Sequence, residues 1–398
     1  MGLQAGIGTR RAASGRGGQR SMGEFLLGWR DRLLASPRFQ RAAARFPLTR
    51  PLARRRARTL FDLSAGFVYS QILFACVKLR LLEALSEGPR DVACIARTVD
   101  LPEEATLRLL RAAASLRLVQ AAGHKYRLGD LGAAMLGNPS IAAMVSHHER
   151  LYADLADPLA LLANPGNTHL SAYWPYAGNA DRDGIQATDV AAYSELMAAS
   201  QAMLASDILD AVSMQSSRHL LDVAGGEGVF LSAALTRWDH LTGCVIDLPA
   251  VAERARSRLA SSAVAARATA MPVDMFTQAW PTGADLISLV RVLHDHDDDP
   301  ARELLHRARA ALAPGGRILV AEPMAQTPGA EPAGDGYFGF YLLAMGSGRP
   351  RSAGELGDML RAAGFRRVRE LKTAQPMLVR VLTAEAGAAK DKDLKKAR

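Results

Sequence analysis

The chain has 398 residues, 49% of them hydrophobic, a length that allows two or three domains, each with its own core. Its net charge of +9 is concentrated at the ends, because residues 1–58 carry +12 and residues 386–398 carry +3. The part between them, 59–385, sums to −6. This distribution argues against a general nucleic-acid groove and favours a local attraction between the basic ends and an anionic partner.

Cysteine usage and hydropathy indicate the cellular compartment. Cys76, Cys94 and Cys244 are far apart and have no paired spacing, so we expect reduced thiols in a cytoplasmic protein and no metal site. Charged residues interrupt the longest apolar region, 60–85, and we therefore expect no transmembrane span. The first twenty residues lack the apolar core of a secretory signal, and Met22 is an alternative start.

The N-terminal segment 1–58 is predicted to be a basic, partly disordered arm. Apolar side chains recur in it at helical spacing between arginines, namely at Phe25, Leu26, Trp29, Leu33 and Leu34. Such a helix can lie on an anionic membrane, here the inner-membrane surface, or pack as a strap onto the body or onto a partner subunit. Both alternatives stay open. The basic tail 385–398 is predicted to be disordered.

Residues 59–130 show the pattern of helices followed by a winged helix. The expected elements are a helix over 69–86, a short helix over 92–97, a helix over 102–116 and a wing from Gly123 to Leu128. A DNA-binding regulator is therefore a rival interpretation. The candidate recognition helix, however, has Glu103 and Glu104 at the end that would meet phosphate, and it has core-like spacing at Leu107, Leu110 and Ala114. We expect no nucleic-acid partner.

The rest of the chain divides into two parts. Residues 131–215 are predicted to be a helical linker with substrate-pocket elements, including a loop at 164–184. Residues 216–384 alternate apolar strands with helices, which predicts an α/β domain with a parallel sheet. Its last two strands, near 365–371 and 377–383, are expected to pair antiparallel.

A glycine-rich turn at 220–230 is the first candidate site. An apolar strand runs into Asp222 and then into a bend with Gly225, Gly226 and Gly228. Glycines there allow positive φ and close approach of a ligand, and the following helix offers free N–H groups. The third glycine of a dinucleotide fingerprint is missing, so a dinucleotide is not the expected ligand.

Two further strand ends carry polar residues in the same order. One strand ends at Asp247, roughly twenty residues after the glycines, where doubly wound folds place a carboxylate for ribose hydroxyls. Capping of the helix that begins at Pro249 is an alternative role. Further on, Asp274 and Met275 precede Phe276 at the end of another short segment.

The segment 284–300 reads as a buried strand followed by His294 and a cluster of acids. Histidine titrates near neutral pH and can act as a general base. The alternative is a surface histidine beside a helix whose first turn is capped by Asp297, Asp298 and Asp299. The next strand, 315–323, carries Glu322 at its carboxyl end, where a carboxylate can fix the tautomer of a histidine.

Together these motifs resemble those of the class I S-adenosylmethionine-dependent small-molecule O-methyltransferases. The resemblance implies a Rossmann-like sheet, an N-terminal winged-helix-like dimerisation domain, a homodimer and S-adenosylmethionine as cofactor. It implies that His294 is the general base, that Glu322 orients it and that Asp295 shares this work. A second glutamate of the family is replaced by Pro350 in this chain. The implied cofactor-binding residues are Asp222, Gly225, Gly226, Gly228, Asp247, Leu248, Asp274, Met275 and Arg291.

Within that family, the arginine-rich arm is similar to the bacterial demethylspheroidene (hydroxyneurosporene) O-methyltransferases of carotenoid synthesis. An apolar acceptor such as a hydroxylated carotenoid is therefore expected, with another aromatic or tetrapyrrole natural product as the alternative. The apolar segment 334–348 lies where the family has its substrate lid. These side chains could instead belong to the domain core or to a dimer interface. The predicted pocket residues are Met197, Tyr337, Phe338, Tyr341 and Met345.

Overall fold

The protein is described by a computed structural model that covers residues 22–173 and 187–387. The chain divides into two compact units, Met1–Ile72 and Leu73–Arg398, which are treated separately below. The predicted disorder at the start of the arm and in the basic tail concerns residues outside the described ranges, as does half of the loop predicted at 164–184.

The first unit is helical. It consists of α1 (Met22–Ala35), α2 (Pro37–Arg45) and most of α3 (Arg50–Lys78). Ser36 caps α2, because its hydroxyl accepts a hydrogen bond from the backbone of Phe39 at 3.4 Å. The helix predicted from the apolar spacing is confirmed, and the side chains of Phe25, Leu26 and Trp29 are more than half exposed.

Helix α3 bears on the expectation of no transmembrane span. It contains an 18-residue window with a mean hydropathy of 1.6, of which only 6% is buried. The charges near the ends of 60–85 leave this window between them, so α3 could cross a membrane by length and composition alone, which does not overturn the expectation. Its exposed apolar side chains recur every three to four residues, at Leu60, Phe61, Leu63, Phe67 and Val68.

The second unit begins with a small helical domain that follows the predicted order of elements. Its elements are α4 (Leu81–Ala84), β1 (Arg90–Asp91), α5 (Val92–Val99), α6 (Glu103–Ser115), β2 (Val119–Ala122) and β3 (Lys125–Leu128). The three strands form an antiparallel sheet in the order β1-β3-β2. Leu110 is fully buried, as the spacing predicted, whereas Leu107 and Ala114 are half-buried.

A group of helices connects this domain to the large sheet. They are α7 (Asp130–Leu136), α8 (Pro139–Asp154), α9 (Pro158–Ala163), α10 (His169–Tyr173) and α11 (Ala187–Ala211). Leu151, Leu161 and Leu170 from this group form a hydrophobic cluster with Tyr341 and Leu342 of α15 (Gly339–Met345). The segment after the fifth parallel strand is thus packed against the linker helices.

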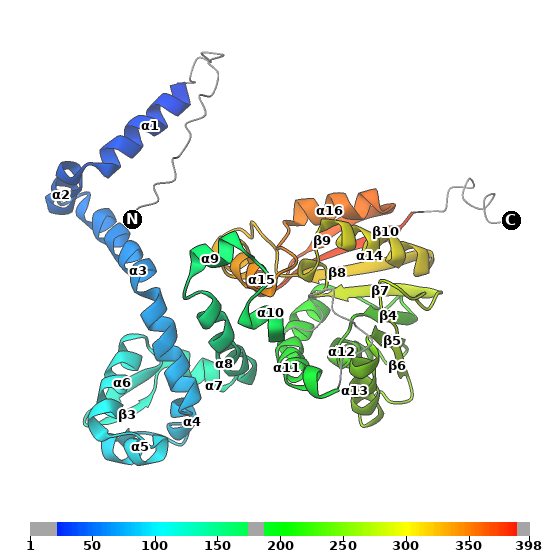
Figure 1. The fold of residues 1–398 in the computed structure, drawn as a ribbon, viewed down its shortest axis with the longest axis horizontal. Helices are drawn as coiled ribbons and strands as arrows, with labels where there is room; N and C mark the ends of the chain where they lie inside the picture. The colour runs from blue at the N-terminus through cyan, green and yellow to red at the C-terminus, as the bar shows by residue number, and fades with distance from the viewer. Residues whose placement is uncertain (1–21, 174–186, 388–398) are drawn as a thin grey trace, which may run out of the picture. The chain divides into compact units, whose positions relative to one another are not determined.

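In the described part of the catalytic domain, seven strands form one sheet in the order β6-β5-β4-β7-β8-β10-β9 (Figure 1). The first five are parallel, and β10 pairs antiparallel with both neighbours, which confirms the predicted last pair. The strands are β4 (His219–Val223), β5 (Thr242–Asp247), β6 (Ala268–Pro272), β7 (Ala284–Val290), β8 (Leu312–Glu322), β9 (Phe365–Leu371) and β10 (Arg380–Ala386).

Helices cover both faces of this sheet. One hydrophobic cluster joins Leu221 and Ile287 to Leu304 and Leu360, and the other joins Leu220 to residues of α11, α12 and α13. The remaining elements are α12 (Val229–Arg237), α13 (Pro249–Ala260), the 3₁₀ helix η2 (Leu293–Asp295), α14 (Asp298–Ala311), the π-helix η3 (Pro332–Phe338) and α16 (Ala353–Ala362). The chain reverses its winding direction between β4 and β7, where doubly wound sheets bind ligands.

Candidate active site

The glycine turn after β4 adopts backbone conformations that favour glycine. Gly226 and Gly228 have φ of +58° and +75°, and Gly228 is the N-terminal cap of α12. A Cβ atom on Gly225 would lie 2.4 Å from Oδ2 of Asp222, so that position has no room for a side chain. The turn therefore needs glycine for two reasons, backbone conformation and close packing.

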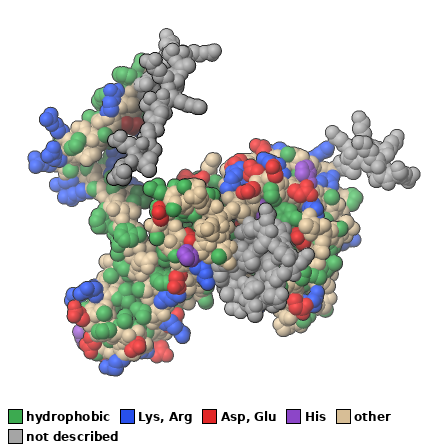
Figure 2. Space-filling model, in the orientation of Figure 1, with side chains coloured by type: hydrophobic (Ala, Val, Ile, Leu, Met, Phe, Trp, Pro, Cys, Tyr) green, Lys and Arg blue, Asp and Glu red, His purple; other side chains and the backbone are tan. Residues whose placement is uncertain are grey.

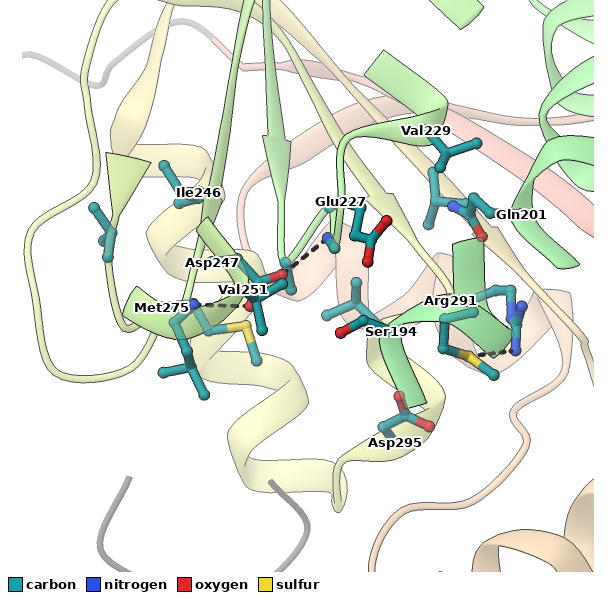
Figure 3. Close-up of a pocket in the computed structure, with 18 of the residues that line it drawn as sticks. Ser194, Gln201, Glu227, Val229, Ile246, Asp247, Val251, Met275, Arg291 and Asp295 are labelled. Atoms are coloured by element: carbon teal, nitrogen blue, oxygen red, sulfur yellow. Dashed lines mark hydrogen bonds between the residues drawn. The ribbon is translucent and has the colours of Figure 1, made fainter. Parts of the chain in front are cut away.

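Asp247 connects this turn to β5. Its Oδ2 accepts a hydrogen bond from the backbone N–H of Gly226 at 2.9 Å, and its Oδ1 accepts one from Leu248 at 2.8 Å, drawn as dashed lines in Figure 3. Burial nevertheless raises the pKa of Asp247 to about 6. The capping alternative is not observed, because Leu248 occupies the cap position of α13.

A pocket opens beside the turn, at the carboxyl ends of the parallel strands (Figure 3). The predicted cofactor-binding residues that line it are Gly225, Gly226, Asp247, Leu248, Asp274, Met275 and Arg291. Met197 and Asp295 also line it, whereas Asp222 and Gly228 support the turn from behind the pocket wall. Sequence reasoning missed Ser194 and Gln201, because helical spacing on α11 does not reveal which face meets the pocket.

Glu227 also lines the pocket and was not singled out from the sequence, although it lies within the glycine motif. Its carboxylate is almost fully buried and is paired with two arginines of α13, Arg254 at 2.6 Å and Arg258 at 3.1 Å. The two ion pairs fasten the glycine turn to α13. The turn is therefore attached to the β5–α13 segment at two places. One is the hydrogen bond from Gly226 to Asp247 at the end of β5, and the other is the pair of ion pairs from Glu227 to α13.

Asp222 is an uncompensated acid beneath the turn. Its Oδ1 accepts a hydrogen bond from the Ser288 hydroxyl at 2.5 Å, and among the described residues no donor reaches its Oδ2. Burial raises the pKa of Asp222 to about 7. This buried carboxyl group lies beneath the glycine turn and not in the lining of the pocket.

His294 lies in η2, just after the end of β7, and β7 is the strand next to β4 in the sheet. Its Nδ1 is hydrogen-bonded to Oε2 of Glu322, at the end of β8. The other oxygen of Glu322 accepts hydrogen bonds from the backbone of Val292 at 3.0 Å and Leu293 at 2.8 Å. Glu322 thus holds both the imidazole and the loop that carries it.

The second ring nitrogen of His294 also meets a carboxylate. Nε2 lies 3.1 Å from Oδ1 of Asp295, and the imidazole is only 6% exposed. Burial opposes a charge on the ring, but the carboxylates of Asp295 and Glu322 outweigh it and raise the pKa of His294. Burial raises the pKa of Asp295 to about 6. The three side chains can accept, hold and release a proton.

The alternative of a surface histidine beside simple helix caps is not observed. His294 is buried, and Asp297 at the start of α14 makes no side-chain cap. Asp297 instead accepts a hydrogen bond from the backbone of Gly348 at 3.0 Å. Asp298 is bound by Arg349 and Arg351, whose hydrogen bonds lower its pKa to about 2.

The predicted substrate-pocket residues fall into two groups. The Phe338 ring lies 6.1 Å from the imidazole of His294, and the sulfur of Met197 lies 3.4 Å from the Arg291 guanidinium. Tyr341 and Met345 are instead buried in the cluster of α15 with the linker helices. The Tyr337 ring is 5.0 Å from that of Phe338, so it is near the histidine side of the site.

No group of three or more potential metal ligands occurs among the residues that the structure describes. The pocket residues provide hydrogen-bonding and apolar groups, carboxylates and one histidine, His296, while His294 lies behind Asp295.

Comparison with known proteins identifies the family. The O-methyltransferase domain profile matches residues 152–366, and the O-methyltransferase dimerisation domain profile matches residues 61–138. Demethylspheroidene O-methyltransferase of Cereibacter sphaeroides is 41% identical, over 89% of this chain and 93% of its own length. The enzyme of the same name from Rhodobacter capsulatus is 37% identical over 89% of both chains.

The fold agrees with solved structures. The crystal structure of human N-acetylserotonin methyltransferase in complex with S-adenosylmethionine is similar with a TM-score of 0.71 at 24% identity, over 83% of this chain and 98% of that one. This likeness supports the expected α/β sheet with an N-terminal dimerisation domain. The chain belongs to the S-adenosylmethionine-dependent O-methyltransferase family.

Proposed function

We propose that this enzyme methylates a hydroxyl group of a hydroxylated carotenoid, with His294 as the general base. The acceptor class is supported by the two relatives whose names state demethylspheroidene as substrate. The base is supported by one observation above all, a buried imidazole held at both nitrogens by carboxylates, one of which lines the pocket. Another aromatic or tetrapyrrole natural product is the alternative acceptor.

The residues of the pocket fit S-adenosylmethionine. Asp247 can accept hydrogen bonds from ribose hydroxyls with the lone pairs that Gly226 and Leu248 leave free. Met275 and Phe276 offer apolar surface for an adenine ring. The carboxylates that line the pocket suit a positively charged ligand. When bound, S-adenosylmethionine supplies an electrophilic methyl carbon on a sulfonium.

The proton of the acceptor hydroxyl would go to Nε2 of His294. Glu322 accepts from Nδ1–H and so fixes the tautomer in which Nε2 is the proton-accepting nitrogen, with Oδ1 of Asp295 3.1 Å away to stabilise the proton once it arrives. The imidazolium that forms is then stabilised by Glu322 and Asp295 on its two sides. The resemblance to the carotenoid enzymes implies a tertiary hydroxyl on the acceptor. A tertiary alcohol is a much weaker acid than a phenol, so His294 takes the proton as the carbon–oxygen bond forms. Positioning therefore supplies most of the rate.

The side chains near His294 favour an apolar acceptor. The hydroxyl of Tyr337 is 2.8 Å from Nε2 of His148, and the hydroxyl of Tyr341 is 2.8 Å from Nε2 of His147. Because both hydroxyls are engaged by the protein, Tyr337 presents its ring and not its polar end beside Phe338. A long hydrocarbon suits such a wall better than a polar molecule does.

Product analysis tests the proposed acceptor. Purified enzyme is incubated with methyl-labelled S-adenosylmethionine and a panel of hydroxylated carotenoids, flavonoids and tetrapyrroles, and the products are identified by mass spectrometry. We expect the label on the hydroxyl oxygen of a carotenoid. Labelling of a flavonoid or a tetrapyrrole alone would contradict the carotenoid proposal and leave the methyl-transfer activity in place.

We further propose that the enzyme is a homodimer that works at the surface of the cytoplasmic membrane. The exposed apolar side chains of α3 lie at or beside the start of the matched dimerisation domain, which begins at residue 61. A second copy of the chain would cover them. The arm adds exposed arginines, part of the blue surface in Figure 2, and the side chains of Phe46 and Leu48 are also exposed. Four of these arginines lie close together in α3 and have no ion pair with a described residue, namely Arg54, Arg55, Arg56 and Arg58.

Sedimentation with liposomes tests the membrane proposal. Binding to anionic vesicles should weaken as ionic strength rises, because attraction between exposed charges is screened by salt. Replacing Arg54, Arg55, Arg56 and Arg58, four of the fourteen arginines of the arm, by glutamine should weaken this binding strongly and leave activity on a detergent-solubilised acceptor intact. The control carries the same replacement at four exposed arginines of the catalytic domain, Arg302, Arg361, Arg366 and Arg369. Unchanged vesicle binding with a dissociated dimer would instead identify the arm as a strap.

A further inference from the structure

The segment 346–352, which connects α15 to α16, lies on the loop that carries His294. Arg351 within it is only 2% exposed. Its Nη1 donates a hydrogen bond to the backbone oxygen of Leu293 at 2.7 Å, and its Nη2 donates one to the backbone oxygen of His296, also at 2.7 Å. The guanidinium thus binds the backbone on both sides of the pair formed by His294 and Asp295.

The same guanidinium is anchored by an acid. Nε and Nη2 of Arg351 donate to Oδ1 of Asp298 at 3.0 and 2.8 Å. A buried arginine needs such compensation, and its planar fork of donors lets it bind two carbonyls and one carboxylate at fixed angles. Lysine has the charge but not this fork.

Two neighbours of Arg351 reach the same loop. The hydroxyl of Ser347 donates to the backbone oxygen of Asp295 at 3.0 Å. Gly348 has a φ of +80°, and a Cβ atom there would lie 2.1 Å from the backbone oxygen of His294. The approach of the two segments is therefore so close that only glycine fits at this position.

We propose that Arg351 is a positioning residue for the general base, which it holds through the backbone of Leu293 and His296. The inference rests on the proposed role of His294. Pro350, next to Arg351 in sequence, replaces the second glutamate that the family resemblance implied. Proline has no carboxylate to bind the histidine, and in this chain Arg351 holds the histidine loop through two backbone carbonyl groups. Loss of the fork lets Asp295 and the imidazole move apart, and misplacement by about 1 Å can cost about a hundredfold in rate.

The test compares Arg351→Met and Arg351→Lys with Arg349→Met as control. Arg349 binds the same Asp298 but makes no hydrogen bond to the loop carbonyls among the described residues. Arg351→Met loses every donor of the fork and should lower kcat by about a hundredfold. Arg351→Lys keeps the charge and one donor group, so it should lower kcat by less. Affinity for S-adenosylmethionine, measured by calorimetry, should stay unchanged in Arg349→Met and should change far less than kcat in the two Arg351 variants.

The pH profile separates positioning from a general structural role. The carboxylate of Asp295 helps to raise the pKa of His294, and a looser loop weakens that contact. The acidic limb of kcat should therefore shift to lower pH in Arg351→Met and stay in place in Arg349→Met. If Arg351→Met does not fold, Arg351→Lys decides the question by the same two measurements.

Two results would overturn this inference. One is normal kcat in folded Arg351 variants, and the other is a lower kcat with an unmoved acidic limb, since a structural defect lowers the rate equally at every pH. His294→Ala is measured in parallel. If His294→Ala is inactive and the Arg351 variants are normal, only the inference fails, whereas an active His294→Ala enzyme would refute the proposed base itself.

Discussion

Replacement of Asp247 by asparagine should weaken cofactor binding by a predictable amount. The carboxylate accepts hydrogen bonds at both oxygens, from Gly226 at 2.9 Å and from Leu248 at 2.8 Å. An asparagine has one acceptor oxygen in place of two, so it cannot serve both backbone donors and the ribose hydroxyls, and at least one hydrogen bond from the ribose to a charged group is lost. Such a bond contributes about 1.5–3 kcal/mol. At 1.4 kcal/mol per factor of ten, affinity should fall by about 10- to 150-fold.

Titration calorimetry with S-adenosylmethionine measures this loss, and thermal unfolding of each variant establishes that it is folded. Asp239→Asn serves as control, because the Asp239 side chain is 99% exposed and does not line the pocket. An Asp247→Asn protein that is folded and binds with unchanged affinity would refute the reasoning, since the ribose hydroxyls would then not depend on the carboxylate of Asp247.

The same carboxylate gives the affinity a pH dependence with a defined sign. Burial raises the pKa of Asp247 to about 6, so protonation removes an acceptor as pH falls through that value. Affinity for S-adenosylmethionine should therefore decline below about pH 6 in the natural enzyme. In Asp247→Asn this part of the decline should be absent. A profile that is identical in the two proteins would assign the pH dependence to another group.

Three further variants test other parts of the account. Gly226→Val should weaken cofactor binding, because φ of +58° is strained for a β-branched residue, and calorimetry with unchanged affinity would contradict this. Phe67→Asp, at a side chain that is 73% exposed, should shift the protein from dimer to monomer in light scattering, and an unchanged mass would place the interface elsewhere. Glu322→Gln should lower kcat less than loss of His294 does, because it perturbs orientation and leaves the proton acceptor in place; an equal loss would make Glu322 part of the proton transfer itself.

The order of strands and motifs could be predicted because its signals are local. The strand before Asp222 is a run of apolar residues followed by glycines, and this combination specifies a strand-to-helix turn from the sequence alone. Asp247 and Glu322 were found because they end parallel strands, and all such ends meet at one edge of the sheet. The site was thus predictable wherever a residue's place on a strand determines its place in space.

The contacts between segments could not be predicted in this way. The burial of Arg351 depends on the packing of the α15–α16 connection against the histidine loop, 58 residues away in sequence from Leu293. The contact of Asp295 with Nε2 of His294 depends on the tight turn of η2. Tyr337 at the end of η3 and Tyr341 in α15 both pack against the cluster of the linker helices, and the sequence does not show that His148 and His147 of α8 bind their hydroxyls.

Hydropathy alone also left α3 ambiguous. The same apolar window suits a membrane span, a buried helix or an interface with a second subunit, and composition does not distinguish among them. The match of the dimerisation domain to residues 61–138 favours the interface, which is information about the family and not about the local sequence.

The most direct test of the central claim is the single-turnover rate of methyl transfer in His294→Ala at saturating S-adenosylmethionine. We predict a rate lower by about a hundredfold or more, as for loss of a positioned general base, with cofactor affinity close to that of the natural enzyme. His306→Ala, at an exposed position of α14, should leave the rate unchanged. A His294→Ala enzyme with near-normal rate would contradict the account and assign catalysis to proximity alone.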